Sequence, residues 1–274
     1  MVATIKGEIK WLILGGDGQL GKALGKELEF NNDRFFSLNR QQVDIRKSES
    51  VLQAFEEYNP DVVVNVAAWT NVDAAETHES EARIINALGP QNIAYACAKS
   101  RVKFVHLSSD YVFSGKFQRP WPEYAATCPV SAYGRTKAEG ELLVLSGYPT
   151  GSFVVRTAWL YSEWGINFAK TMARRAIKEV DPIQVVTDQV GQPTSASHLA
   201  AQIRMLVVSD AKPGLYHGTN SGQTTWYEFA KRIFQQVGAD ESRLKPIISD
   251  ALIRPAQRPR YSVLGHQQLS LIHI

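Results

Sequence analysis

The stretch that decides the fold is Trp11–Glu29, "WLILGGDGQLGKALGKELE", in which an apolar run leads through glycines into a helical pattern. Glycines there permit a tight turn and a close approach of the backbone to a pyrophosphate, and a helix start offers it free N–H groups. The GxxGxxG spacing therefore predicts a dinucleotide-binding loop, with a plain strand–turn–helix as the alternative. The residues expected to bind the cofactor in this loop are Gly15, Gly18, Gln19, Leu20 and Gly21.

Strand-like and helical segments alternate along the first 158 residues. The apolar runs "KWLILGG", "RFFSLN", "PDVVVNVAA", "VKFVHLSS" and "SFVVRTAW" are nearly continuous, as in strands buried on both faces. Between them lie helical patterns at Gln19–Phe30, Ser48–Tyr58, Glu79–Ser100 and Ser131–Leu145. We therefore predict an α/β fold, a Rossmann-like doubly wound parallel sheet with right-handed crossovers.

The regular alternation of strands and helices ends after Thr157. Beyond it, short strands and loops separate helical patterns at 166–179, 196–208 and 224–237. We expect part of this region to form a small C-terminal substrate-binding lobe. The expected core is 1–158, with return segments near 183–214. The expected lobe is 159–182 and 215–268.

The last six residues, Leu269–Ile274 ("LSLIHI"), do not continue the polar stretch before them. They are similar to the translation of a transposon end used to prepare sequencing libraries. We therefore expect 269–274 to be a non-native tail and a final helix of the fold to be missing.

The composition excludes several classes of protein. A net charge of +3, from 30 basic and 27 acidic residues, is too balanced to indicate binding to nucleic acid or a membrane surface. No apolar run approaches a membrane span and no signal peptide is recognisable, so a cytoplasmic location is expected. Cys97 and Cys128 suit a reducing compartment, and the six histidines lack metal-ligand spacing, so no metal site is predicted.

The second predicted strand ends in "SLNRQQVDI", Ser37–Ile45, and its tip bears on the choice of cofactor. An NAD-specific protein would place an acid there to hold the ribose 2′-hydroxyl, but the tip carries Asn39 and Arg40. Arginine suits a 2′-phosphate, so NADPH is favoured and NADH remains an option. A solvated surface charge is the alternative interpretation of Arg40.

A serine, a tyrosine and a lysine follow in the order that carbonyl reduction needs. Ser109 ends a buried strand, and Tyr133 and Lys137 are four residues apart, on one face of the next helix. Hydride transfer to a carbonyl carbon leaves the oxygen in need of a proton, which Tyr133 could donate as general acid. A tyrosine with a pKa of about 10 needs a nearby cation, such as Lys137, to become a stronger acid.

Lys137 could also hold the nicotinamide ribose, and Ser109 could bond the substrate oxygen. Each residue alone is more often structural: a strand end, an aromatic at a helix start, a solvated lysine. Their order after a glycine loop favours an enzyme.

The chain resembles dTDP-4-dehydrorhamnose reductases, of the extended short-chain dehydrogenase/reductase superfamily. The matching segments are "GGDGQLG", "NPDVVVNVAAWTNVDAAE", "LSSDYVF", "YGRTKAEGE", "VRTAWLY", "NFAKTM", "DQVGQPTSA" and "GLYHGTNSGQTTWYEFA". The resemblance implies NADPH-dependent reduction of the C4 keto group of dTDP-4-dehydro-L-rhamnose to dTDP-L-rhamnose, with catalytic residues Ser109, Tyr133 and Lys137.

The resemblance also implies the remaining site residues. Those beside the cofactor would be Asp44, Ile45, Ala67, Ala68 and Thr70, with Tyr133 and Lys137. Those around the nucleotide sugar would be Asp110, Tyr111, Trp159, Asn167, Phe168, Gln189, Pro193 and Arg258. Arg258 and Arg260 could reach a diphosphate, or they could belong to a disordered basic tail. Some members of the family are metal-linked dimers, but no metal is carried over to this chain.

Other functions remain open at this point. One is a regulatory dinucleotide-binding subunit resembling the beta subunit of methionine adenosyltransferase, and another is a reductase or epimerase of a different nucleotide sugar. The helices Glu79–Ser100 and Ser131–Leu145 could pack in a homodimer or simply cover the sheet.

Overall fold

The structure, a computed structural model, describes residues 9–271 and is built around one parallel sheet. Six strands lie in the order β10-β5-β4-β3-β1-β2, and every neighbouring pair is parallel. The sheet confirms the predicted α/β fold. Its strands are β1 (Lys10–Leu14), β2 (Arg34–Leu38), β3 (Val62–Asn65), β4 (Lys103–Ser109), β5 (Ser152–Thr157) and β10 (Gly214–His217).

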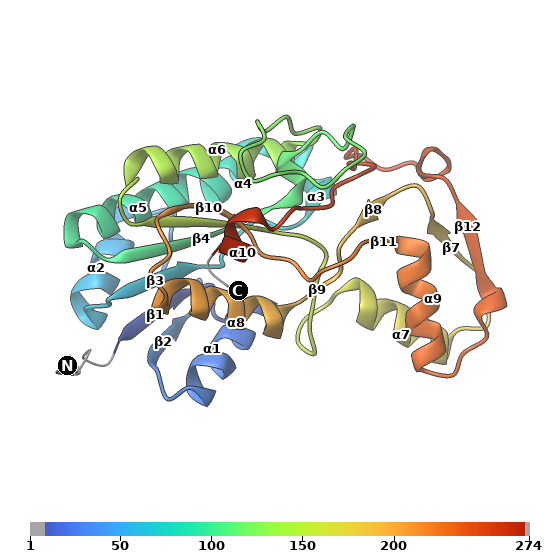
Figure 1. The fold of residues 1–274 in the computed structure, drawn as a ribbon, viewed down its shortest axis with the longest axis horizontal. Helices are drawn as coiled ribbons and strands as arrows, with labels where there is room; N and C mark the ends of the chain where they lie inside the picture. Colours follow the sequence, from blue (N-terminus) through green and yellow to red (C-terminus); the bar gives the residue numbers. More distant parts are fainter. Residues whose placement is uncertain (1–8, 272–274) are drawn as a thin grey trace.

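Helices cover both faces of this sheet because its strands are apolar on both sides (Figure 1). Trp11 and Ile13 pack with helices α1 (Gln19–Phe30) and α8 (Ala196–Val208). Leu12 and Leu14 turn to the opposite face. The helices there are α2 (Ser48–Tyr58), α5 (Gly89–Ser100) and α6 (Ala132–Gly147).

The strand order reverses at β1, which pairs with β2 on one side and with β3 on the other. In open α/β sheets, ligands bind in the crevice outside the carboxyl ends of the strands at such a switch point. The glycine loop follows β1 directly, so the fold places it at this crevice.

The predicted helix Glu79–Ser100 has no gap, but it changes to a π-helical turn near its middle. Short α3 (Val72–Ala75) and α4 (Glu79–Arg83) come first, and a π-helical turn, η1 (Ile84–Leu88), then joins α4 to α5. The turn brings the carbonyl oxygen of Asn86 against Gly140 of α6, where any Cβ would collide with it. The π-helical turn η1 therefore packs closely against α6.

A small lobe extends from one end of the sheet (Figure 1). Its core is the parallel pair β7 (Ile183–Val186) and β12 (Leu244–Ile247) under helices α7 (Phe168–Lys178) and α9 (Trp226–Gln236). Two short pairs complete its strands: β6 (Leu160–Tyr161) with β9 (Thr194–Ser195), and β8 (Val190–Gly191) with β11 (Thr224–Thr225). The remaining short helices are η2 (Asp110–Val112), η3 (Glu241–Arg243), η4 (Ser249–Ala251) and α10 (Gln267–Leu271).

The return to the core begins later than residue 183. Ile183 and Val185 point into the lobe, where they pack with Phe234, so β7 pairs with β12 instead of joining the large sheet. Helix α8 and strand β10 are the segments that go back to the core. The other expected domain boundaries stay predictions.

The expected non-native tail overlaps α10 in the structure. Leu269 is buried in the core cluster on the α1/α8 face of the sheet. Residues 272–274 lie outside the described residues, and the hypothesis of a non-native tail stays a prediction. Within residues 9–271, none of the helices combines the length and apolarity needed to cross a membrane.

Candidate active site

The glycine loop is closely confined by its neighbours. Gly15 has φ +94°, a conformation that side-chain-bearing residues rarely adopt, and a Cβ there would lie 2.6 Å from the backbone nitrogen of Ala67. A Cβ on Gly21 would lie 2.6 Å from the carbonyl oxygen of Gly15. The first turn of α1, Gln19–Phe30, carries no acidic side chain that would oppose an anion at the positive end of its dipole. This cradle fits the pyrophosphate of a dinucleotide.

The residues predicted to lie at the adenine end of the cofactor, Arg40, Asp44 and Ile45, differ in their burial and in their partners. Arg40, just after β2, is exposed, and no hydrogen bond or ion pair reaches it from any part of residues 9–271. The carboxylate of Asp44 accepts two hydrogen bonds from Arg46 at 2.8 Å, which hold the pKa of Asp44 below its usual value. Ile45 is buried, with its side chain against Gly89.

The segment after β3 passes beside the glycine loop. Ala67 and Ala68 are half-buried there, and Thr70 is exposed. The side chain of Asn86 accepts from the backbone nitrogen of Trp69 and donates to its carbonyl oxygen, at 2.8 and 3.2 Å. The π-helical turn therefore fixes the course of this segment across the crevice.

The predicted serine, tyrosine and lysine come together at the carboxyl end of β4. Ser109 ends β4, and Ser131 caps α6 so that Tyr133 lies in its first turn. The hydroxyl of Ser109 lies close enough to the Tyr133 phenol to lower its pKa, and it donates to Asp110 at 3.0 Å. Lys137, one turn further on, is buried and donates from Nζ to the carbonyl oxygen of Leu107 at 2.5 Å.

Burial dominates the electrostatics of this cluster. It raises the pKa of Tyr133 to about 12, a rise that the neighbouring Ser109 opposes and the charge of Asp110 reinforces. It lowers the pKa of Lys137 to about 8, which the charge of Glu141 opposes. The sequence predicted that Lys137 makes Tyr133 a stronger acid. In the structure Lys137 donates to the carbonyl oxygen of Leu107, and its effect on the acidity of Tyr133 stays a prediction.

Asp110 and Tyr111 extend the cluster toward the lobe. Asp110 is buried and accepts a hydrogen bond from Ser109 at 3.0 Å, and burial raises its pKa to about 6. The ring of Tyr111 meets that of Tyr133 edge to face, with centroids 5.5 Å apart. Burial raises the pKa of Tyr111, and the charge of Arg258 opposes the rise.

Trp159 lies where β5 leads into the lobe. It has a positive φ of +46°, which is uncommon for a bulky residue, and its ring stacks on that of Trp226. A Cβ on Gly191 would lie 2.5 Å from the Trp159 ring, so glycine is required beneath it. Pro193, two residues on, is half-buried between β8 and β9.

The first helix of the core is joined to the first helix of the lobe by side chains. Asn167 caps α7 by accepting from the backbone nitrogen of Lys170, and it donates to Gln19 at 2.9 Å. Gln19 also accepts from Ser162 at 3.0 Å. Gln19, predicted to bind the cofactor, thus contacts Asn167, predicted to bind the nucleotide sugar. Leu20, by contrast, is buried in the core beneath the loop, and Phe168 packs against Trp226.

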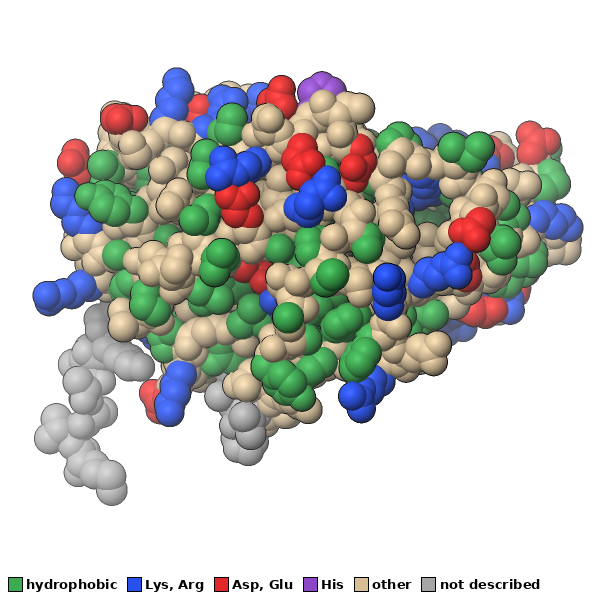
Figure 2. Space-filling view, turned by 90° about the horizontal axis from the view of Figure 1, so that it is seen from above, with side chains coloured by type: hydrophobic (Ala, Val, Ile, Leu, Met, Phe, Trp, Pro, Cys, Tyr) green, Lys and Arg blue, Asp and Glu red, His purple; other side chains and the backbone are tan. Residues whose placement is uncertain are grey.

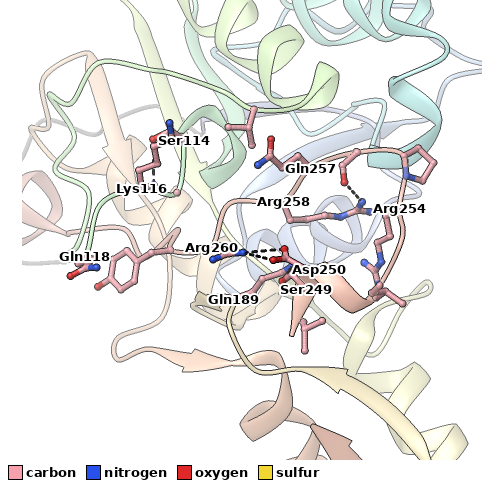
Figure 3. Close-up of a pocket in the computed structure, with 17 residues that line it drawn as sticks. Ser114, Lys116, Gln118, Gln189, Ser249, Asp250, Arg254, Gln257, Arg258 and Arg260 are labelled. Atoms are coloured by element: carbon pink, nitrogen blue, oxygen red, sulfur yellow. Dashed lines mark hydrogen bonds and ion pairs between the residues drawn. The ribbon is translucent and has the colours of Figure 1, made fainter. Parts of the chain in front are cut away.

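A pocket of about 870 Å³ opens between the core and the lobe. Figure 2 shows this side of the surface hollowed, with Lys and Arg side chains around the hollow. Gln189 lines it and donates to Ser249 at 2.9 Å. The basic side chains that line the pocket are those of Lys116, Arg254, Arg258 and Arg260 (Figure 3).

The two arginines predicted for a diphosphate already have acidic partners. Arg258 binds both carboxylate oxygens of Asp73 at 2.6 Å, and only a tenth of its side chain is exposed. Arg260 binds Asp250 at 3.0 Å (Figure 3). Lys116 and Arg254 have no carboxylate partner in the described part of the chain, so they are the cations freest to bind an anion.

Several side chains that shape the site are missed by sequence reasoning. Arg156 lies within an apolar strand, and that pattern could have indicated a buried ion pair. Arg254 lies close in the sequence to Arg258 and Arg260, but it was not singled out with them. The other missed residues are Asp73, Asn86, Glu141 and Trp226.

A glycine loop at the switch point of a parallel sheet, with Ser109, Tyr133 and Lys137 at the next strand end, defines a Rossmann-like protein with the site of short-chain dehydrogenases/reductases. The family model described as RmlD substrate binding domain matches residues 9–274. The chain belongs to this family, and the resemblance to dTDP-4-dehydrorhamnose reductases is confirmed.

Characterised relatives are similar over nearly the whole chain. The dTDP-4-keto-6-deoxy-D-glucose reductase of Streptomyces niveus is 42% identical over 94% of this chain and 88% of its own. The dTDP-4-dehydrorhamnose reductase of Streptomyces griseus is 43% identical over 94% and 86%. The crystal structure of the Bacillus anthracis dTDP-4-dehydrorhamnose reductase in complex with NADP has a TM-score of 0.92, with 36% identity over 96% of this chain and 92% of that one.

Proposed function

We propose that this protein uses NADPH to reduce the C4 keto group of dTDP-4-dehydro-L-rhamnose, giving dTDP-L-rhamnose. The observation that carries the proposal is the convergence of Ser109, at the end of β4, with Tyr133 and buried Lys137 of α6 at the crevice. The names of the relatives support it, because they are reductases of dTDP-linked 4-ketosugars.

Bound NADPH would supply the hydride that reduces the carbonyl carbon. Tyr133 donates its phenolic proton to the carbonyl oxygen, and Ser109 donates a hydrogen bond to the same oxygen. With a pKa of about 12, Tyr133 is protonated at neutral pH, as the proton donor of a reduction must be. With a pKa of about 8, Lys137 is mostly charged and can bind the nicotinamide ribose hydroxyls.

The pocket at the lobe suits the nucleotide part of the substrate. A nucleoside diphosphate carries two or more negative charges, and Lys116 and Arg254 supply cations without carboxylate partners. Arg258 is held by Asp73 and lies near Tyr111, whose pKa its charge lowers, so its role is to shape the wall of the pocket. The diphosphate therefore binds Arg254 in preference to Arg258.

The proposal includes a choice of cofactor. Arg40 is exposed and unpaired within the described residues, at the end of β2 where a 2′-phosphate would lie. NADPH is therefore preferred over NADH. The NADP bound in the Bacillus anthracis structure supports this preference.

A homodimer in the cytoplasm is the remaining part of the proposal. Helices α5 and α6, named as the candidate interface, carry exposed Tyr95 and Leu142. Contact through these side chains would cover apolar surface. Sedimentation at several protein concentrations would distinguish the dimer from a monomer.

The substrate is tested with a panel of purified dTDP-, GDP- and UDP-linked 4-keto-6-deoxysugars. Loss of NADPH absorbance is followed for each sugar, and the product is identified. The proposal expects turnover with dTDP-4-dehydro-L-rhamnose to exceed that with the GDP and UDP sugars. Turnover confined to another nucleotide sugar, or NADPH binding without any turnover, would contradict it.

A further inference from the structure

A carboxylate lies buried beneath the catalytic cluster. Glu141 is on α6, one turn beyond Lys137 and two turns beyond Tyr133. It is buried together with Ser108 and Arg156, which belong to neighbouring strands and lie opposite each other in the register of β4 and β5.

Glu141 uses both of its oxygens to bind these two strands. Oε1 accepts from Ser108 Oγ at 2.5 Å and from Arg156 Nε at 2.8 Å. Oε2 accepts from Arg156 Nη2 at 2.6 Å. The guanidinium also lies 4.8 Å from the ring centre of Phe113. One side chain of the helix therefore fixes the ends of two strands.

This arrangement determines where the catalytic side chains meet. Ser108 immediately precedes Ser109, and Leu107, before it, accepts the hydrogen bond of Lys137. The bonds of Glu141 and Lys137 therefore hold the same face of α6 to two consecutive residues of β4, Leu107 and Ser108. Any shift of α6 along β4 would separate Tyr133 from Ser109.

Glu141 is also the carboxylate that acts on the charge of Lys137. The charged groups that interact with Lys137 are Glu141, on α6 itself, and His106 of β4, while Arg156 of β5 faces Lys137's neighbour Glu141. Burial and Lys137 lower the pKa of His106, so the imidazole is neutral and adds no charge. Arg156 is neutralised by Glu141.

We propose that Glu141 is a positioning residue of the reductase site, which holds α6 in register with β4 and keeps Lys137 positively charged. The inference rests on the proposed function. Glu141 itself lies beneath the site and is not a proton donor to the substrate.

The test compares Glu141→Gln with Glu139→Gln, a matched control on the same helix. Glu139 pairs with Arg83 at the surface, so its loss is expected to matter little. For Glu141→Gln we expect kcat to fall by about 10- to 100-fold, because small misplacements of catalytic groups are costly. The loss of kcat/KM at alkaline pH, the alkaline limb of the pH profile, should also begin about one pH unit or more lower than in the wild type, because Lys137 loses its counter-charge.

Glu141→Asp separates the two effects. It keeps the charge but shortens the reach, so kcat should fall while the alkaline limb stays in place. Wild-type kcat and an unmoved limb in Glu141→Gln would overturn the proposal. If Glu141→Gln does not fold, Ser108→Ala decides the positioning claim: a kcat lowered about threefold or more at unchanged KM supports it, and wild-type kcat overturns it.

A second measurement distinguishes failure of the proposed function from failure of the role proposed for Glu141. It is NADPH binding, followed by tryptophan fluorescence from neutral to alkaline pH. If the wild type reduces no ketosugar, the proposed function fails, but Lys137 still titrates. Binding that weakens at lower pH in Glu141→Gln than in Glu139→Gln then supports the role of Glu141. Identical pH dependence in the two variants overturns it.

Discussion

Trp159, which follows β5, and Trp226, which begins α9, stack face to face, with ring centroids 3.6 Å apart and planes 9° apart. Trp159 also holds a positive φ, and Gly191 leaves no space beneath its ring. Backbone strain of this kind persists only where surrounding contacts over-determine the conformation. The stack therefore fixes α9 of the lobe to the end of β5, close to the cluster around Ser109.

Replacing Trp226 should weaken substrate binding more than cofactor binding. In Trp226→Ala we expect KM for the dTDP-ketosugar to rise about 3- to 10-fold, because an aromatic pair contributes about 0.5–1.5 kcal/mol beyond its buried area. The dissociation constant for NADPH should stay near that of the wild type. Steady-state kinetics and fluorescence binding check this, with Trp226→Phe as the control. Equal weakening of both ligands would show that the stack supports the whole fold instead.

Arg40 should determine the preference for NADPH. Loss of a charge-assisted bond to the 2′-phosphate in Arg40→Ala should raise KM for NADPH about 10-fold or more and leave KM for NADH nearly unchanged. Arg34→Ala is the matched control, because Arg34 is exposed at the opposite end of β2. Unchanged discrimination between the cofactors in Arg40→Ala would assign Arg40 to the solvated surface.

Asp110 should make the protein less stable as the pH rises. Its folded pKa of about 6 exceeds the ordinary value of 3.8, so its protonated form is favoured in the folded state. The stability that this adds is present below about pH 4 and is lost as pH rises through about 6. At neutral pH, Asp110→Asn should therefore stabilise the fold, by about 1–3 kcal/mol. Urea unfolding at two pH values tests this, and a variant destabilised equally at both would contradict it.

The pH profile of the reduction should report Lys137. Because burial lowers its pKa to about 8, deprotonation should make kcat/KM fall above about pH 8. Tyr133, with a pKa of about 12, should stay protonated throughout this range. Initial rates measured from about pH 6 to pH 10 check the limb. Activity that stays constant to about pH 10 would show that Lys137 remains charged in the complex.

Local patterns predicted much of the fold because they are set by neighbouring residues. Helices α1, α2 and α8 begin and end where the periodicity and flanking residues place them, and the five apolar runs are strands. Contacts between distant residues were not predictable in this way. The π-helical turn depends on Gly140 of another helix, and β7 joins the lobe through β12, some sixty residues later.

The same division applies to the candidate site. Ser109, Tyr133 and Lys137 could be found because one strand and one helix carry them in a recognisable order. The partners that constrain site residues come from far along the chain: Asp73 holds Arg258, and Arg156 holds Glu141. An ion pair of this kind leaves no local pattern, so neither the sequence nor the resemblance indicated that Asp73 holds Arg258.

The central claim is that Tyr133 protonates the reduced carbonyl. It is tested most directly by comparing Tyr133→Phe with the wild type under single-turnover conditions, using dTDP-4-dehydro-L-rhamnose and NADPH. We predict that hydride transfer slows by about 10²- to 10⁴-fold, the usual contribution of general acid catalysis, while the NADPH dissociation constant is unchanged. Hydride transfer in Tyr133→Phe at close to the wild-type rate would contradict the account.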